Sequence, residues 1–375
     1  MKEITFFHCA DVHLDSPFSS LAGKPGLSAA RRRELMEAFS RMITNVRNEK
    51  PDLLIIAGDL FENTYVQLST VSNLNVMFGT IPDTRILMIT GNHDLEAANS
   101  YYRAYEWGNN VYFLGEEQKS IYFEDINTWI HGLGWGVGQG FGNRLDSIKP
   151  DKDKFNILIF HGDIDLQIGS RDYNSISSEI AGSMGFDYVA AGHNHRKRIY
   201  KDIICNPGSL DPLGFDEPGI HGYFKGILSK DSGLNVEFVE NSHVEYVTIE
   251  LDITGMNNDS VVLDALNKDM KKEKVLYKVL LKGAKTIEYT PDTIFIANTL
   301  LEHVLFARVR DESTVRVPVE DLSLLKGLKG EFTRTVMEKI EGADEEEKEI
   351  LMKALYYGIE AMDKGNIEKA GGIEL

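Results

Sequence analysis

The sequence predicts a layered α/β domain, followed by a small α+β domain and a helical C-terminal segment. Short apolar runs without alternation recur over the first 240 residues, and each ends in polar residues. Such runs are typical of strands that are buried on both faces. Helical periodicity fills the stretches between the first runs, and near residue 244 the pattern changes. The chain has 375 residues, so we expect more than one compact core.

The first domain is expected to contain five central strands. They are residues 4–9, 53–57, 86–90, 157–160 and 188–191. Two helices are expected between the first three strands, over residues 28–50 and 67–79. Ser28 is the expected N-cap of the first helix, because a serine hydroxyl can accept from a free backbone N–H there. From about residue 109 to 240, short strands joined by glycine and aspartate turns replace the helical patterns.

The expected boundaries are 1–243 for the first domain, 244–315 for the small α+β domain and 316–375 for the helical segment. The small domain should contain strands 244–251 and 275–281 and helices 259–273 and 292–305. In the last segment, one helical stripe is formed by Leu325, Leu328, Phe332, Val336 and Ile340. Asp344 and Glu347 have the spacing of a capping box at the start of a further helix.

Composition excludes several classes of protein. No apolar run reaches the roughly 18 residues of a membrane span, and the N-terminus lacks the pattern of a signal peptide. Two cysteines, Cys9 and Cys205, cannot form a disulfide framework, so a cytoplasmic protein without membrane contact is expected. With 40 basic and 58 acidic residues, the net charge is −18. This charge argues against a protein that holds nucleic acid by bulk electrostatics.

Polar motifs follow each of the five expected strands. In chain order they are Asp11-Val12-His13, Gly58-Asp59, Gly91-Asn92-His93-Asp94, His161-Gly162-Asp163 and Gly192-His193-Asn194-His195. If the strands lie side by side, their ends bring these side chains together. Carboxylate, amide and imidazole ligands without thiolate suit manganese, iron or zinc. Seven ligands fit two ions that share one bridging carboxylate, an arrangement that can clamp a phosphate.

Each motif alone is common at the end of a strand, but the five in this order are not. The ordered set resembles that of the calcineurin-like metallophosphoesterases. The flanking residues 9–18 and 206–209 are most similar to the SbcD/YhaO-type DNA repair exonucleases of bacteria. The resemblance covers about residues 1–240. It implies a four-layer β-sandwich flanked by helices, with a dimetal site at the strand ends.

The resemblance also implies roles for individual residues. The first metal would be held by Asp11, His13, Asp59 and His195. The second would be held by Asp59, Asn92, His161 and His193, so that Asp59 bridges the two. His93 would act catalytically beside the scissile phosphate, with Asp94 orienting it. The ions implied are two divalent metals, Mn²⁺ first, with iron, zinc or magnesium as alternatives.

One position departs from the nuclease pattern. Many SbcD-type nucleases have a second functional histidine three residues after the bridging aspartate, and this chain has Glu62 there. Glu62, Arg196 and Arg198 are the candidate substrate contacts, since the two arginines follow His195 closely. His8 and His131 match no ligand motif and are expected to be core or turn histidines.

The leading hypothesis is a manganese-dependent phosphodiesterase that acts on DNA ends. The resemblance implies an SMC-like coiled-coil ATPase of the SbcC type as partner, docked by the terminal helices, and it is compatible with a homodimer. The second hypothesis is a phosphodiesterase or phosphatase for small phosphorylated molecules, which Glu62 and the charge of −18 favour. The third is a non-catalytic scaffold, which the complete set of ligands and His93 disfavours.

Overall fold

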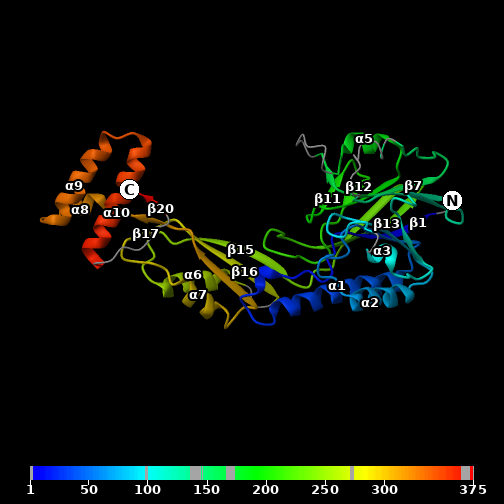
Figure 1. The fold of residues 1–375 in the computed structure, drawn as a ribbon, viewed down its shortest axis with the longest axis horizontal. Helices are drawn as coiled ribbons and strands as arrows, with labels where there is room; N and C mark the ends of the chain where they lie inside the picture. The colour runs from blue at the N-terminus through cyan, green and yellow to red at the C-terminus, as the bar shows by residue number, and fades with distance from the viewer. Residues whose placement is uncertain are drawn as a thin grey trace. The chain divides into compact units, whose positions relative to one another are not determined.

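The computed structural model describes residues 3–97, 100–135, 145, 147–165, 174–270, 274–364 and 372–374. The chain forms two compact units, Met1–Glu245 and Tyr246–Leu375 (Figure 1). The second unit contains two apolar clusters, and the expected boundary near residue 315 stays a prediction. Among the residues described, no helix is both long and apolar enough to cross a membrane.

The first unit is a sandwich of two six-stranded sheets. One sheet has the order β14 (Gly233–Glu240), β13 (Gly222–Ser229), β1 (Ile4–Cys9), β2 (Leu53–Ala57), β3 (Arg85–Ile89), β4 (Val111–Phe113). The other has the order β11 (Arg198–Tyr200), β12 (Ile204–Asn206), β10 (Tyr188–Gly192), β7 (Phe155–His161), β6 (Thr128–Leu133), β5 (Ser120–Phe123). The five strands expected from sequence lie inside these sheets, and the expected fold class is confirmed.

The inner strands of each sheet are parallel. Strands β1 to β4 run in one direction, and β6, β7, β10 and β12 also run parallel to one another. Phe6, Ile55 and Leu87 of one sheet share a buried core with Ile130 and Ile157 of the other. Because both faces of these strands are covered, their sequences are continuously apolar.

Helices form the outer layers of the sandwich. Helices α1 (Leu27–Glu49) and α2 (Leu68–Gly79) lie on one side, and the short α5 (Ser178–Ser183) lies on the other (Figure 1). The predicted N-cap of α1 is wrong: the helix begins at Leu27, and its N-cap is Gly26 with a φ of 81°. The Ser28 hydroxyl instead donates to the Phe18 carbonyl at 3.0 Å.

Shorter elements connect the strands of this unit. They are η1 (Ser19–Leu21), α3 (Tyr101–Ala104), β8 (Asp163–Ile164) and β9 (Ser175–Ile176). Strands β8 and β9 pair in parallel directly after the end of β7.

The second unit begins with a three-stranded sheet. It has the order β15 (Glu245–Asp252), β16 (Val275–Lys282), β18 (Phe306–Asp311), and its helices are α6 (Asp259–Asp269) and α7 (Thr293–Leu300). Val279 of β16 and Ile296 of α7 are fully buried in one cluster. Residues 271–273 of the expected first helix lie outside the described part of the chain.

The remainder of the second unit is a small parallel sheet with three helices. The strands are β17 (Ala284–Thr286), β19 (Thr314–Arg316), β20 (Gly372–Glu374), and the helices are α8 (Val319–Leu324), α9 (Leu328–Glu341), α10 (Glu345–Lys364). Residues 365–371 and 375 of the expected helical segment lie outside the described ranges. The Asp344 carboxylate accepts the Glu347 N–H at 2.9 Å, as the capping box predicts. Val336 and Ile340 are buried, whereas Leu328 is 76% exposed.

The buried His8 makes the first unit sensitive to acid. Its Nδ1 lies 2.8 Å from the Tyr188 hydroxyl, between β1 and β10. Burial lowers the pKa of His8 from 6.5 to about 3, although a backbone contact with Ala191 partly offsets it. Below pH 6.5 the unfolded chain therefore binds a proton that the folded chain excludes. The free energy of unfolding should fall by up to about 1.4 kcal/mol per pH unit as the pH drops from 6.5 towards 3.

Urea unfolding of metal-free protein between pH 7 and 5 tests this expectation. His8→Asn keeps a polar group near Tyr188 and removes the titrating ring, so its unfolding free energy should depend less steeply on pH. An unchanged slope in His8→Asn would show that other groups cause the acid sensitivity.

Candidate metal centre

The carboxyl ends of the inner strands of both sheets meet at one edge of the sandwich. Asp11 and Asp59 follow β1 and β2, His161 is the last residue of β7, and His193 follows β10. A hydrogen bond joins the two sheets at this edge, since the His161 Nδ1–H donates to the Ala57 carbonyl at 2.8 Å. This bond directs Nε2 of His161 into the site, where that nitrogen could bind a metal in place of a proton.

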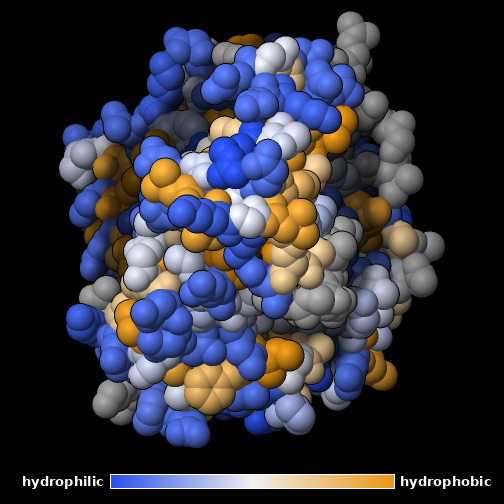
Figure 2. Space-filling view, turned by 90° about the vertical axis from the view of Figure 1, so that its left-hand side faces the viewer, coloured by the Kyte–Doolittle hydropathy of each residue, from blue (hydrophilic) through white to orange (hydrophobic). Residues whose placement is uncertain are grey.

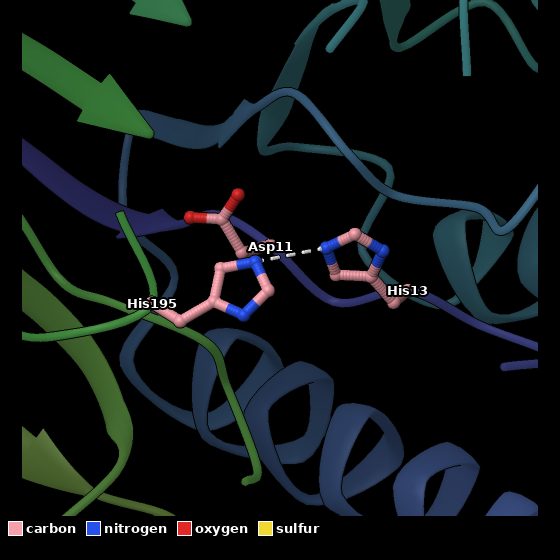
Figure 3. A group of neighbouring side chains, drawn as sticks. All are labelled: Asp11, His13 and His195. Carbon is pink, nitrogen blue, oxygen red and sulfur yellow. Dashed lines mark hydrogen bonds between the residues drawn. The ribbon is translucent and has the colours of Figure 1, made fainter. Parts of the chain in front are cut away.

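The first predicted ligand group is assembled in the structure. Atoms of Asp11, His13 and His195 that could bind a metal all lie within 4.8 Å of one another. The two imidazole Nε2 atoms face each other at 3.2 Å, beside the Asp11 carboxylate (Figure 3). The two nitrogens are hydrogen-bonded to each other here, and both could bind a metal in place of the shared proton. Asp11 and His13 follow the end of β1, whereas His195 lies in the loop after β10, 182 residues after His13.

The second group is built around Asp59. Its Oδ2 lies 3.3 Å from Nε2 of His161 and 3.6 Å from Nε2 of His13. Asp59 therefore contacts ligands of both groups, which is the position of a bridging carboxylate. The side-chain oxygen of Asn92 lies 3.2 Å from Nε2 of His161 and 2.9 Å from Nδ1 of His193. All seven predicted ligands thus meet in one place.

The backbone at these positions is strained. Asp11, His13 and Asp59 have φ values of 50°, 49° and 49°, and His193 has a φ of 102°. Non-glycine residues rarely adopt positive φ, and clusters of such residues are typical of functional sites. Because of this backbone conformation, the side chains of these four predicted ligands point to the place where the two sheets meet.

Two glycines allow the strand ends to approach this closely. A Cβ at Gly58, whose φ is 87°, would lie 2.3 Å from Nδ1 of His161. A Cβ at Gly91 would lie 2.1 Å from the Asp59 carboxylate. Any larger residue at either position would displace a predicted ligand.

The electrostatics of the cluster fit divalent cations. The carboxylates of Asp11 and Asp59 are 0% and 1% exposed. Burial by itself would raise the pKa of Asp59, but the charge and hydrogen bond of His161, together with His13 and the His93 N–H, lower it. Burial likewise opposes protonation of His161, yet Asp59 raises the pKa of His161 to about 9. In the absence of metal, protons thus supply the positive charge that buried carboxylates need.

Glu217 orients one of the ligands. The His195 Nδ1–H donates to Glu217 Oε1 at 2.6 Å, which leaves Nε2 for a metal. The other carboxylate oxygen accepts from the Ser209 hydroxyl at 2.7 Å and the Leu213 N–H at 3.0 Å. Burial would lower the pKa of His195, but this contact with Glu217 raises it to about 9. This role of Glu217 was not among the expectations from the sequence.

We expect Glu217→Gln to weaken binding at the first metal site by about 10- to 100-fold, because partners that orient a histidine ligand contribute this much. Calorimetric titration of metal-free protein with Mn²⁺ measures the change. Asp216→Asn is the matched control, since it removes the same charge from an exposed neighbour. Equal losses in both variants would show that general charge, not the His195 contact, determines affinity.

His93 and Glu62 form a pair at the mouth of the cluster. Nδ1 of His93 lies 3.0 Å from Glu62 Oε2, and its side chain is 44% exposed. The backbone N–H of His93 also donates a hydrogen bond to Asp59 Oδ1 at 2.8 Å. A hydrogen bond from His13 lowers the pKa of Glu62, so Glu62 is a carboxylate next to both histidines. Nε2 of His93 is therefore the nitrogen left for a substrate.

The expected role of Asp94 is wrong. Its carboxylate accepts the backbone N–H groups of Gly91, Leu60 and Phe61 and the Tyr102 hydroxyl. Glu62, not Asp94, contacts the His93 ring. Asp94 instead fixes the loops after β2 and β3. Burial raises the pKa of Asp94 to about 6, and the nearby Asp59 charge adds to the shift.

A pocket of about 340 Å³ opens beside the candidate ligands. It is lined by Asp163, His193, Asn194, His195, Arg196, Asp216 and Glu217. The Arg196 guanidinium donates to the Asp216 carbonyl at 3.1 Å. Arg198 is exposed on β11, outside the lining of this pocket. Of the two predicted basic contacts, Arg196 is thus the one placed next to the ligands.

Comparison with known proteins defines the class of this chain. Residues 4–197 match the calcineurin-like phosphoesterase family, and the chain belongs to that family. Members of this family hydrolyse phosphoesters and typically bind two divalent metals, for which the clusters above offer ligands. The expected resemblance is therefore confirmed.

Two curated relatives lie near the nuclease branch. The chain is 27% identical over 299 residues to the uncharacterized metallophosphoesterase YhaO of Bacillus subtilis, covering 76% of this chain and 72% of YhaO. It is 28% identical over 266 residues to the DNA double-strand break repair protein Mre11 of Methanopyrus kandleri, covering 62% and 56%. The crystal structure of TT1561 of Thermus thermophilus matches at 12% identity with a TM-score of 0.39, over 63% of this chain and 98% of that one.

Proposed function

We propose that this protein is a manganese-dependent phosphodiesterase that hydrolyses backbone phosphodiesters at DNA ends. The convergence of seven predicted oxygen and nitrogen ligands, with Asp59 in contact with both groups, carries the proposal. Oxygen and imidazole ligands without thiolate suit manganese. The similarity to a relative named for double-strand break repair supports DNA as the substrate.

The ligand groups explain how an acidic protein could act on a polyanion. Two divalent cations held here would neutralise phosphate charge and activate water for attack. Asp11, His13 and His195 would hold one cation, and Asn92, His161 and His193 the other, with Asp59 between them. With the metals bound, the net charge of −18 would oppose DNA binding less than it would in the metal-free protein. Arg196 adds a local positive charge beside His195.

His93 is the residue that we expect to meet the leaving group. Its Nδ1 is occupied by Glu62, and its exposed Nε2 can donate a proton or a hydrogen bond to the departing oxygen. Glu62 holds the ring in this orientation. The carboxylate at this position thus positions His93 and does not contact phosphate directly.

Hydrolysis of small phosphorylated molecules is the second candidate. Glu62 at the usual position of a second histidine favours it, because a carboxylate repels the backbone of a long polyanion. A non-catalytic scaffold is disfavoured, since His93 and all seven residues predicted as ligands lie close together.

The partner that we propose is a coiled-coil ATPase of the SbcC type, bound by the terminal helices. Leu324, Leu325 and Leu328 at the α8–α9 junction are 81%, 45% and 76% exposed. Figure 2 shows apolar side chains among the polar ones on the face that it draws. A homodimer stays a prediction.

Cys9 and Cys205 are buried free thiols, which supports a cytoplasmic location.

Manganese-dependent activity on three substrates tests the proposed function. We expect hydrolysis of linear duplex DNA, of single strands and of bis-p-nitrophenyl phosphate, with DNA cleavage starting at ends. A covalently closed circle of the same duplex is the matched control. Cleavage confined to the small diester would overturn the DNA proposal and favour the second candidate.

A further inference from the structure

A second cavity lies on the outer face of the sheet that contains β6. Its volume is about 460 Å³, which is in the range of small-molecule sites. Trp129, His131 and Leu133 of β6 line it together with Ile148, Lys119 and Lys149. Alternate residues of a strand share a face. Because Ile130 faces the core between the sheets, His131 and its two neighbours face outward. None of these residues lines the pocket at the metal centre.

His131 has a polar atom that the described chain leaves unpaired. The residue is 7% exposed, and its Nδ1 lies 2.8 Å from the Ser120 hydroxyl. Its buried Nε2 has no hydrogen-bond partner within the residues that the structure describes. A buried unpaired polar atom costs about 1–3 kcal/mol, so a group that pairs with it gains that contact. The unpaired nitrogen belongs to a residue that lines the cavity.

The surroundings of His131 favour a flat ligand with a negative charge. The Trp129 and His131 rings lie nearly parallel, at 15°, with centroids 6.0 Å apart. Burial lowers the pKa of His131 to about 4, so at neutral pH the ring offers a hydrogen bond and no charge. Lys119 and Lys149 bring two ammonium groups to the lining. Lys119 lies 3.7 Å from the Glu116 carboxylate, and the Asp151 carboxylate lies 3.3 Å from Lys154.

We propose that this cavity binds a nucleotide, with its base against Trp129 and His131 and its phosphate at Lys119 and Lys149. A heterocyclic base offers ring faces for stacking and edge atoms that can pair with Nε2 of His131. A free mononucleotide and the terminal nucleotide of a strand share this chemistry. The inference does not depend on the proposed DNA activity, because the cavity and the metal centre have different residues.

Calorimetric titration of the full chain in EDTA tests the proposal with dAMP, deoxyadenosine and a short single-stranded oligodeoxyadenylate. We expect dAMP to bind one to one and deoxyadenosine at least about tenfold more weakly, since it lacks the phosphate for the lysines. If the oligonucleotide binds as tightly as dAMP, the cavity accepts the terminal nucleotide of a strand. Much weaker binding of the oligonucleotide would identify the free mononucleotide.

Matched variants locate the ligand. Lys149→Ala and His131→Phe should each weaken dAMP binding at least about tenfold, whereas Lys152→Ala, which removes an exposed lysine outside the lining, should not. Melting curves check that His131→Phe folds, and the exposed Lys149 gives a second variant if it does not. No dAMP binding up to millimolar concentration would overturn the proposal. Binding that survives both cavity variants, or is lost in Asp59→Asn, would overturn it as well.

Discussion

Asp59→Asn should reduce hydrolysis by about a thousandfold or more. The substitution removes the charge of a carboxylate that contacts His13 of one group and His161 of the other. Metal ions contribute several kcal/mol of transition-state stabilisation, and each 1.36 kcal/mol is a factor of ten in rate. We expect both metals to bind more weakly, because the shared ligand serves both. Steady-state kinetics with metal titration measures the two effects together.

Asp216→Asn is the matched control for this variant. Asp216 lines the pocket beside the ligands, but it is exposed and is not one of the seven predicted ligands. The activity of Asp216→Asn should stay within a small factor of that of the unmodified protein. If Asp59→Asn keeps near-normal activity with both metals bound, a bridging role for Asp59 is excluded.

His93→Gln should lower kcat by about 10²- to 10⁴-fold while both metals stay bound, because general acid catalysis contributes about this much. The His93 side chain is outside the predicted ligand set, and Glu62 holds its Nδ1 at 3.0 Å. Glu62→Gln should lower kcat less, since the ring remains but its orientation loosens. Metal content is measured on the same samples.

The nature of the leaving group separates two roles of His93. A nitrophenolate leaves without protonation, whereas the sugar oxygen of DNA needs a proton. If His93 donates that proton, the loss in His93→Gln is much smaller for bis-p-nitrophenyl phosphate than for DNA. Equal losses would mean that His93 stabilises phosphate charge and does not protonate the leaving group. Full activity on DNA would contradict both roles.

The central strands and the meeting of the polar motifs at their ends could be predicted because the signals are local. The strand that ends at Ala57 is five apolar residues long, and the turn after it begins with Gly58-Asp59. A buried parallel strand requires such a run, and its end exposes the next polar residues. The convergence of ligands then followed from strand ends meeting at one edge.

Other features depend on contacts between distant residues, which no local pattern reveals. Strand β13 pairs with β1, so that Ile4 lies opposite Leu228. The resemblance implied that Asp94 orients His93, yet the Asp94 carboxylate turns inward to backbone N–H groups. Glu217 reaches His195 only through the fold, 22 residues further along the chain. Ser28 was expected to cap α1, but the left-handed backbone at Gly26 starts the helix earlier.

The most direct test of the metal centre is a crystal structure of protein loaded with Mn²⁺, using anomalous scattering to locate the ions. We expect two peaks about 3.5–4 Å apart, with Asp59 between them, His13 and His195 at one and His161 and His193 at the other. A single ion, or ions bound away from these residues, would contradict the assignment of a dimetal phosphoesterase site to this edge of the sandwich.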